Sequence, residues 1–211
     1  MKPSYRFYKV CYRVARIFLG IFYGLRVQGK ENIPEGAAMI CANHSSIIDP
    51  FLIAFAFSNS YHLHFMAKAE IYKIPVLSAI MRKLGTISVD RSVQDMNSVK
   101  ETLGYLNKGG QVVIFPEGTR SYVENAVSAK NGAVKVSEYA KAPILPVFIP
   151  RRKPLFRKLT LVIGEPYIVE KRREKRSPDE YSRLADSLMS KIESLNPEKN
   201  KNPEFQMRNS E

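Results

Sequence analysis

Cysteine and histidine are scarce in this sequence, and long hydrophobic runs are missing. The two cysteines, Cys11 and Cys41, cannot form a disulfide framework, and no CxxC or Cys/His cluster indicates a zinc site. We therefore expect a reducing compartment and no metal. The longest uncharged run near the N-terminus, residues 17–25, is much shorter than the ~20 residues that span a bilayer. No small-residue cleavage site follows it, which argues against a secretory signal.

Length and composition are those of a globular protein. The chain has 211 residues, of which 45% are hydrophobic and 25% charged, and this balance argues against wholesale disorder and a fibrous design. The length suits one substantial α/β domain or two small ones, and the lack of a repeat or a glycine-rich linker favours one. The formal net charge of +13 indicates a negatively charged partner, such as nucleic acid, an anionic membrane or an acidic protein.

The positive charge is concentrated in two regions. Residues 1–30 hold 7 bases and no acid, and residues 150–176 hold 10 bases and 3 acids, so each region carries +7. Residues 31–149, with 11 bases and 10 acids, are nearly neutral, and residues 177–211 carry −2. The second basic region has few aromatics and no signature of a nucleic-acid-binding fold. It could bind an acidic partner, or it could be a solvated loop and helix start.

The first basic region is also rich in aromatic and aliphatic residues. A basic amphipathic segment of this kind suits a membrane interface, with its apolar face in the headgroup boundary. Each Lys or Arg near an anionic leaflet contributes about 1 kcal/mol, so several together could hold a peripheral protein. The alternative is an N-terminal helix packed on the domain with a solvated basic face. We favour the membrane because the acid-free stretch is long for an ordinary surface helix.

Strand-like and helix-like patterns alternate through the rest of the chain. Short apolar runs typical of buried strands occupy residues 38–42, 62–66, 86–89, 111–115, 144–149 and 159–163. Helical patterns occupy residues 50–58, 75–84, 93–108, 133–140 and 177–195. This alternation predicts a single layered α/β domain with a central mixed or mostly parallel sheet flanked by helices, preceded by the N-terminal amphipathic helical segment.

A loop after the first of these strands carries a histidine and an aspartate. Ligands of α/β sheets gather at loops that follow the carboxyl ends of strands. His44 lies in such a loop, and Asp49 follows five residues later, where a helix begins. The aspartate can accept from one imidazole nitrogen, which fixes the tautomer and leaves the other nitrogen free to take a proton. The alternative is a structural histidine beside an aspartate that caps the helix.

A second loop, residues 115–121, follows another predicted strand and could bind a hydroxylated or anionic ligand. Glu117 and Thr119 can hydrogen-bond hydroxyl groups, and Arg120 can bind an anionic oxygen. Gly118 permits an unusual turn or a close approach to a ligand. The alternative is an ordinary Pro-Gly loop with a surface ion pair.

Two further basic residues follow predicted strands. Arg91 lies just past strand 86–89, where a guanidinium can hold phosphate through paired hydrogen bonds. Asp90 could orient Arg91 or simply pair with it on the surface. Lys68, near the end of strand 62–66, is another phosphate candidate, although a solvated lysine is the commoner outcome.

The order and spacing of these motifs resemble the 1-acyl-sn-glycerol-3-phosphate acyltransferase family of glycerolipid acyltransferases. The resemblance runs from about residue 26 to residue 166 and rests on four ordered blocks, a highly specific match. The blocks are Asn43-His44 with Asp49-Pro50 (HxxxxD), Gly85 with Val89-Asp90-Arg91, Phe115-Pro116-Glu117-Gly118-Thr119-Arg120-Ser121, and Ile144-Leu145-Pro146-Val147.

The resemblance implies transfer of a fatty acyl chain from acyl carrier protein or coenzyme A to the 2-hydroxyl of lysophosphatidic acid, giving phosphatidic acid. His44 would be the general base and Asp49 its orienting partner. The hydroxyl would attack the thioester directly, without an acyl-enzyme, a metal or another cofactor. Arg91 would bind the acceptor phosphate together with Lys68.

The other site residues follow from the same resemblance. Glu117, Gly118, Thr119 and Arg120 would hold the glycerol phosphate, and Pro146 would shape the acyl or thioester site. Backbone N–H groups near Gly118 are the expected donors to the oxyanion.

The resemblance also implies partners and a location. The expected partners are lysophosphatidic acid, an acyl carrier protein or coenzyme A thioester and an anionic membrane surface, but not nucleic acid. We expect a peripheral or monotopic protein on the cytoplasmic face of the cell membrane. An acidic carrier protein could dock on residues 151–158 or residues 171–176. The expected division is a membrane-associating segment at residues 1–28, an acyltransferase domain at 29–196 and a polar tail at 197–211.

Three alternatives stay open on the sequence alone. One is a related acyltransferase that uses glycerol 3-phosphate or another lysolipid as acceptor. Another is a non-catalytic lipid-binding protein at the membrane, although the intact His44 and Asp49 argue against it. The third is a basic nucleic-acid-binding protein, which predicts steeply salt-dependent binding to DNA.

Overall fold

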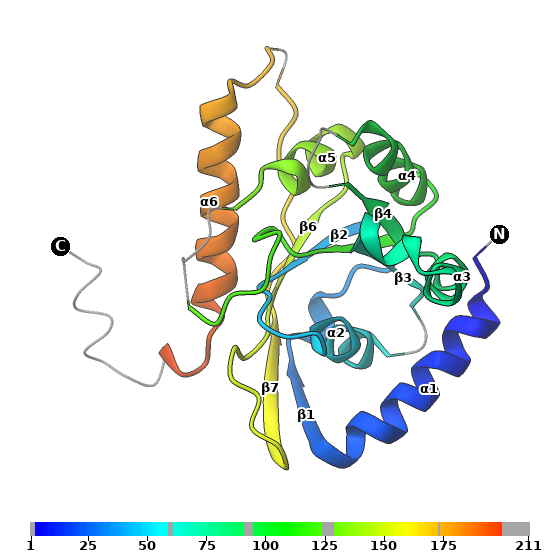
Figure 1. The fold of residues 1–211 in the computed structure, drawn as a ribbon. Helices are drawn as coiled ribbons and strands as arrows, with labels where there is room; N and C mark the ends of the chain where they lie inside the picture. Colours follow the sequence, from blue (N-terminus) through cyan, green and yellow to red (C-terminus); the bar gives the residue numbers. More distant parts are fainter. Residues whose placement is uncertain (1–2, 59–60, 91–94, 124–128, 173, 200–211) are drawn as a thin grey trace.

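A seven-stranded sheet forms the centre of the protein, in the order β1-β7-β6-β2-β5-β3-β4 (Figure 1). The computed structural model describes residues 3–58, 61–90, 95–123, 129–172 and 174–199. The strands are β1 (Tyr23–Gln28), β2 (Ala38–Ala42), β3 (Leu63–Lys68), β4 (Ile87–Val89), β5 (Gln111–Ile114), β6 (Ile144–Phe148) and β7 (Arg157–Ile163). Neighbouring strands are parallel except for β6 and β7, which are antiparallel. The predicted mixed, mostly parallel sheet is therefore confirmed.

Helices cover both faces of this sheet (Figure 1). The α-helices are α1 (Tyr5–Phe22), α2 (Asp49–Phe57), α3 (Pro75–Leu84), α4 (Met96–Leu106), α5 (Gly132–Ala140) and α6 (Pro178–Ser194), and short 3₁₀ turns span η1 (Lys30–Asn32) and η2 (Ala69–Lys73). The predicted helix over residues 75–84 has the bounds of α3. Ser177 caps α6 through a capping box with Glu180, which explains the abrupt start of that helix.

The central strands are buried on both sides, and their alternate residues face different helices. Met39 and Cys41 of β2 pack in the cluster that includes α4, α5 and α6. Ile40 and Ala42 pack in a second cluster with α2. All residues of β2 are buried, and this explains why its sequence is a continuous apolar run rather than an alternating one.

The N-terminal segment contains a strand as well as a helix. The predicted helical segment of residues 1–28 ends earlier than expected: α1 stops at Phe22, and Tyr23 turns into the extended backbone of β1. This strand pairs in parallel with β7 at one edge of the sheet. Its exposure alternates from residue to residue because an edge strand has one covered face. A six-residue edge strand beside a strong helical pattern has too short a period-two signal to separate by sequence.

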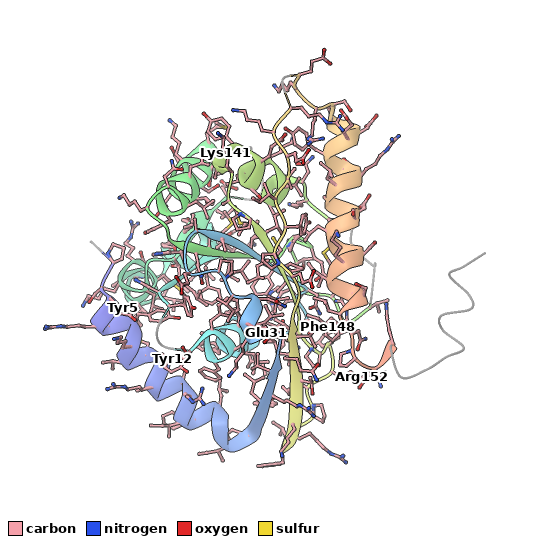
Figure 2. The ribbon with its side chains drawn as sticks, turned by 180° about the vertical axis from the view of Figure 1, so that it is seen from behind. Tyr5, Tyr12, Glu31, Lys141, Phe148 and Arg152 are labelled. Atoms are coloured by element: carbon pink, nitrogen blue, oxygen red, sulfur yellow. The ribbon has the colours of Figure 1, made fainter. Side chains whose placement is uncertain are left out.

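Helix α1 has two apolar faces, and only one of them is covered by the domain. Tyr8 and Tyr12 are buried, and Tyr12, labelled on α1 in Figure 2, lies edge-on against Phe55 of α2. The exposed apolar residues of α1 are Tyr5, Val10, Val14, Ile17, Phe18, Ile21 and Phe22. Within the described residues, no helix is both long enough and apolar enough to cross a membrane.

Candidate active site

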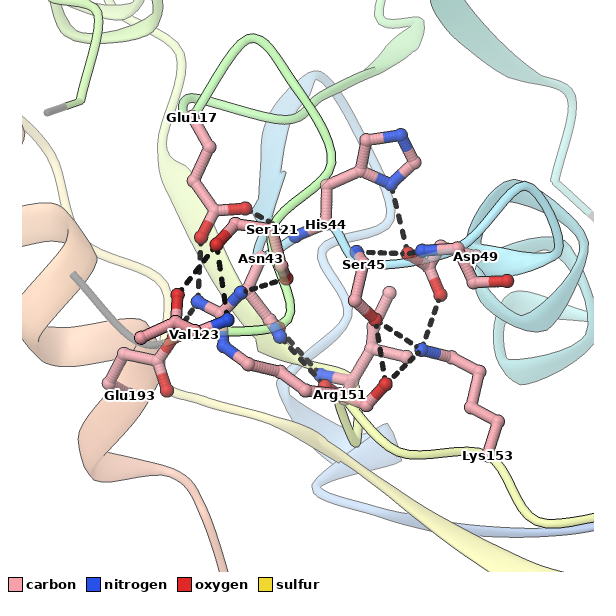
Figure 3. A network of polar contacts seen from close by, with 12 residues as sticks. Asn43, His44, Ser45, Asp49, Glu117, Ser121, Val123, Arg151, Lys153 and Glu193 are labelled. Carbon is pink, nitrogen blue, oxygen red and sulfur yellow. Dashed lines mark hydrogen bonds and ion pairs between the residues drawn. The ribbon is translucent and has the colours of Figure 1, made fainter. Parts of the chain in front are cut away.

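Three chain segments meet where the central parallel strands end. Strands β6, β2 and β5 are neighbours and run in the same direction, so the loops after their carboxyl ends lie at one edge of the sheet. These loops are residues 43–48, 115–123 and 149–153 (Figure 3). The motifs that lie far apart in sequence are thereby brought together.

His44 and Asp49 form a hydrogen-bonded pair in this edge. His44 Nδ1 lies 2.9 Å from Asp49 Oδ2, and the same oxygen accepts the N–H groups of Ser45 and Ser46, each at 2.8 Å. Asp49 is the first residue of α2, where the helix dipole favours a negative charge. An ionised carboxylate accepts from Nδ1–H, so that in the neutral imidazole Nε2 is the nitrogen with the free lone pair. The predicted geometry of the pair is present.

The free edge of the imidazole points away from the aspartate (Figure 3). None of the described residues forms a hydrogen bond with Nε2. The ring stacks on Phe115, with ring centroids 4.1 Å apart, and the side chain is 16% exposed. His44 therefore combines a fixed orientation with an accessible nitrogen, which is what a general base needs.

Asp49 is buried, yet its environment favours the charged form. Burial alone would raise the pKa of its carboxyl group. The hydrogen bond with His44, the Lys153 ammonium and the Ser46 N–H together hold that pKa below its ordinary value. Asp49 therefore stays an acceptor across the physiological pH range.

Backbone hydrogen bonds fix the histidine loop to both neighbouring loops. The side-chain amide of Asn43 donates to the Ile149 carbonyl at 2.7 Å and accepts from the Ile149 N–H at 2.8 Å. These two hydrogen bonds join the loop to the end of β6. On the other side, the Ser121 N–H donates to the His44 carbonyl at 2.8 Å. These contacts hold the backbone of His44 from both sides.

Glu117 is a buried link between loops. Its Oε2 accepts the His44 N–H at 2.8 Å, and its Oε1 lies 2.6 Å from the Arg151 guanidinium. The residue is only 3% exposed. Both carboxylate oxygens are thus engaged within the protein, and this geometry favours a positioning role over the predicted contact with glycerol phosphate.

The Gly118 N–H also differs from expectation. It donates to the Phe115 carbonyl at 2.9 Å and closes the turn of the loop. Gly118 has a φ of +67°, and a Cβ atom at this position would lie 3.1 Å from Lys130 Cε, which explains the glycine. The Gly118 N–H is thus used inside the turn, and the expected role of backbone N–H groups near Gly118 toward the oxyanion stays a prediction.

Arg151 joins the active-site loops to the C-terminal helix. One terminal nitrogen contacts both Glu117 and Glu193 of α6, and the other donates to the Ser121 carbonyl at 2.7 Å (Figure 3). Burial would lower the pKa of Arg151, but the two carboxylates raise it further above its already high value. The arginine is therefore a permanent cation between two buried carboxylates.

Lys153 lies on the opposite side of the pair. Its Nζ is 2.9 Å from Asp49 Oδ1 and 2.6 Å from Ser45 Oγ, and its side chain is 5% exposed. Burial lowers the pKa of Lys153, against the raising effect of Asp49.

The sequence predicts Arg151 and Lys153 in a surface patch, residues 151–158, that could dock a carrier protein. Their side chains are instead largely buried, with 11% of Arg151 and 5% of Lys153 exposed, whereas Arg152 between them is exposed. Arg151 and Lys153 are two residues apart directly after a buried strand. Since positions i and i+2 of an extended chain share one side, this spacing could have indicated that both side chains face the same site. Glu193, on a distant helix, gave no comparable signal.

The remaining predicted site residues lie apart from the pair or outside the described residues. Arg91 is not among the described residues. Lys68 ends β3, is exposed and pairs with Glu70 at 2.9 Å. Thr119 and Arg120 are exposed in the loop after β5. Pro146 is buried in β6, and its carbonyl accepts the Gly164 N–H. Their roles toward a substrate stay predictions.

The second suggested docking patch, residues 171–176, lies away from this site. Its described residues line a cavity of about 740 Å³ between α5 and the start of α6, and neither His44 nor Asp49 lines that cavity. Arg172 pairs with Glu180, and Arg176 pairs with Glu138. Helix α6 has 17 residues and is therefore about 25 Å long, with this patch at its start and Glu193 near its end.

Metal coordination would need a cluster of ligating side chains. Across the described part of the chain, no group of three or more His, Cys, Asp and Glu residues could hold a metal ion. The absence of a metal or cofactor stays a prediction.

Comparisons with known proteins bear on this arrangement. The family model described as Acyltransferase matches residues 24–150. The "1-acyl-sn-glycerol-3-phosphate acyltransferase" of Bacillus subtilis is 32% identical over 165 residues, which cover 75% of this chain and 81% of that protein. The enzyme of the same name from Saccharomyces cerevisiae is 31% identical, and the match covers 68% of this chain and 48% of the yeast protein.

A solved structure shares the fold. The crystal structure of the 1-acyl-sn-glycerophosphate (LPA) acyltransferase from Thermotoga maritima aligns with a TM-score of 0.64 and 28% sequence identity. The alignment covers 92% of this chain and 78% of the Thermotoga chain.

Proposed function

The chain belongs to the Acyltransferase family and is an acyltransferase, and we propose that it acylates the sn-2 hydroxyl of 1-acyl-sn-glycerol 3-phosphate. The acyl donor is a thioester of acyl carrier protein or coenzyme A, and the product is phosphatidic acid. The observation that carries this proposal is the 2.9 Å contact between His44 Nδ1 and Asp49 Oδ2, with Nε2 left open. The names of the Bacillus subtilis and Saccharomyces cerevisiae relatives support the choice of acceptor.

The reaction needs one base and no covalent enzyme intermediate. His44 Nε2 takes the proton of the acceptor hydroxyl as its oxygen attacks the thioester carbonyl carbon. The tetrahedral intermediate then collapses, the carbon–sulfur bond breaks, and His44 returns the proton to the departing thiolate. One hydroxyl and one thioester are consumed, and one ester and one thiol are formed. Asp49 keeps the imidazole oriented and stabilises its protonated form in between.

Lys68 and Arg91 are proposed to hold the acceptor phosphate. Strands β3 and β4 are parallel neighbours, and Lys68 is in register with Val89, two residues before Arg91. Their carboxyl ends lie along the same edge of the sheet as that of β2. Arg91, two residues beyond Val89 in the sequence, would add a second cation to Lys68 for a phosphate with two negative charges. Arg120, exposed in the loop after β5, is a third candidate.

The acceptor is a lipid, so the enzyme is proposed to bind the membrane surface as a peripheral protein. The uncovered apolar face of α1 recurs at intervals of three and four residues, as expected for a helix lying flat in the interface. The same helix carries Arg6, Lys9, Arg13 and Arg16, and no acid. These bases favour an anionic leaflet.

The test is a transfer assay with purified protein and 1-acyl-sn-glycerol 3-phosphate. Carrier-protein and coenzyme A thioesters are offered in parallel, with glycerol 3-phosphate as a second acceptor. We expect phosphatidic acid with at least one donor, and a loss of about 10²- to 10⁴-fold in rate for His44→Ala. Formation of product from neither donor would refute the proposal. Acylation of glycerol 3-phosphate in preference to the lysolipid would favour the related activity.

A further inference from the structure

We propose that Lys153 is a positioning residue for the acyl transfer, which holds one oxygen of Asp49 so that the other stays on His44. The inference rests on the proposed function, because it assigns Lys153 a part in the work of the His44–Asp49 pair. Lys153 lies outside the four sequence blocks, on the segment after β6.

The contacts of Lys153 all lead to the histidine loop and its support. Nζ lies 2.9 Å from Asp49 Oδ1, donates to Ser45 Oγ at 2.6 Å and reaches the Arg151 carbonyl at 3.5 Å. Ser45 Oγ itself donates to the same carbonyl at 3.0 Å. The ammonium thus joins the loop after β2 to the segment after β6 (Figure 3).

The two oxygens of Asp49 have different partners. Oδ2 faces the His44 ring and the N–H groups of Ser45 and Ser46. Oδ1 is buried, and among the described residues Lys153 is its ionic partner, with no hydrogen bond to another group. A turn of the carboxylate out of its present plane would weaken the contacts of both oxygens. Lys153 opposes such a turn because its ammonium attracts Oδ1 in the plane that also places Oδ2 on His44.

Burial makes this pairing consequential. The Asp49 side chain is fully buried and that of Lys153 nearly so, and a charge in such a place is stabilised only when it is paired. Without Lys153, Asp49 Oδ1 is an unpaired buried charge. The carboxylate can relieve this by taking up a proton or by turning, and either change weakens the acceptor that fixes the His44 tautomer.

The surrounding charges set the direction of the pH effect. Asp49 and Lys153 form one neutral pair beside His44, and the Arg151 cation faces the carboxylates of Glu117 and Glu193. Removal of Lys153 therefore adds one uncompensated negative charge next to the base. A proton at the site is then favoured, so the acidic limb of the kcat/KM profile moves to higher pH.

The kinetic test compares Lys153→Met and Lys153→Gln, which remove the charge, with Lys153→Arg, which keeps it. Lys108→Met is the matched control, because Lys108 is an exposed lysine at the end of α4. For both neutral variants we expect kcat to fall by about 10- to 100-fold, the size of effect that follows the loss of a group that orients a metal-bound histidine. The KM for the lysolipid should change little, and Lys153→Arg should recover part of kcat and the position of the acidic limb. The control should match the wild type.

A second measurement needs no substrate. The chain has three histidines, so ¹⁵N-histidine spectra are sparse, and His44→Ala identifies the His44 signals. We expect one tautomer of His44 in the wild type, with Nδ1 protonated, and a mixture or a protonated ring in the neutral Lys153 variants. Circular dichroism establishes which variants fold. If Lys153→Met does not, Lys153→Gln carries the comparison, because its amide can still donate to Ser45.

The outcomes separate this inference from the proposed function. Failure of the wild-type protein to acylate the lysolipid would refute the proposed function. The histidine spectra would still show whether Lys153 controls the tautomer of His44. A folded neutral variant with wild-type kcat, an unmoved acidic limb and an unchanged His44 tautomer would overturn the inference.

Discussion

The side chain of Glu117 accepts a hydrogen bond from the backbone N–H of His44, with 2.8 Å between the two heavy atoms. The loop that contains Glu117 is therefore hydrogen-bonded to the backbone of the proposed base. The other carboxylate oxygen of Glu117 contacts Arg151, and Arg151 in turn contacts Glu193 on α6. The position of His44 thus depends on three segments that are far apart in the sequence.

Substitution of Glu117 should lower kcat rather than substrate affinity. Glu117→Ala leaves the His44 N–H without its acceptor and removes one of the two carboxylates that face Arg151. We expect the free energy of unfolding to fall by about 1–3 kcal/mol, with kcat reduced and the KM for the lysolipid nearly unchanged. Thr119→Ala, an exposed change in the same loop, is the control for stability. A raised KM with normal kcat would instead show that Glu117 binds substrate.

Substitution of Asp49 should affect the rate through the histidine tautomer. Asp49→Asn keeps the size of the side chain but presents an amide that cannot stabilise a protonated imidazole. We expect a loss of about 10²- to 10⁴-fold in kcat, measured by steady-state transfer kinetics. Retention of more than half of the wild-type rate would contradict the assignment of Asp49 as the orienting partner.

Acid should destabilise the fold through a buried histidine remote from the active site. His64 is buried, its Nδ1–H donates to the Gly85 carbonyl at 2.8 Å, and its ring stacks on Tyr105. Burial lowers its pKa from 6.5 to about 4, with His62 adding to the effect and the Gly85 carbonyl opposing it. Between pH 6.5 and pH 4 the unfolded chain takes up a proton that the folded protein does not, so stability falls as the pH falls.

The size of this loss is up to about 3 kcal/mol. Urea unfolding at a series of pH values measures it, with His64→Gln as the comparison. The variant should show a shallower decrease over the same range. Parallel decreases in the two proteins would mean that His64 does not cause the pH dependence.

Membrane attachment should depend on the exposed apolar face of α1. Phe18 is 64% exposed, and Phe18→Glu adds a negative charge to that face. We expect binding to vesicles containing anionic lipid to weaken by about tenfold or more, because apolar burial and charge attraction are both reduced. Tyr139→Glu is the matched control, since Tyr139 is 70% exposed on α5. Sedimentation with vesicles of graded anionic content gives the measurement, and equal weakening by both variants would argue against α1.

An acidic carrier protein should dock on only one of the two basic patches, residues 151–158 and residues 171–176. Arg152→Glu changes an exposed residue between Arg151 and Lys153, and Arg157→Glu changes an exposed residue at the start of β7, whereas Lys171→Glu and Lys175→Glu change the patch at the start of α6. We expect only the first pair to raise the KM for a carrier-linked donor, because its patch lies near Lys153 and Arg151. The KM for a coenzyme A thioester should be affected less. If neither pair raises the carrier KM, docking on either patch is wrong.

Much of the fold could be predicted because its signals are local. The buried runs that form β2 and β6 are continuous and apolar, and the helices begin and end at residues such as Pro75 and Gly85 whose backbone preferences act within a few positions. Strand β1 was missed because its alternating pattern is short and directly follows a helix. The strand that pairs with β1 is β7, more than 100 residues away, so no local pattern indicates the pairing.

The sequence by itself determined the alternation of strands and helices, the five-residue spacing that lets Asp49 reach His44, and the concentration of charge in two regions. Only the tertiary structure decided which charges lie inside. Lys153 contacts Ser45 across 108 positions, and Arg151 contacts Glu193 across 42. A charged side chain is stable in the interior only where folding supplies its counter-charge, and the supply of that partner is a property of the assembled loops rather than of the neighbouring residues.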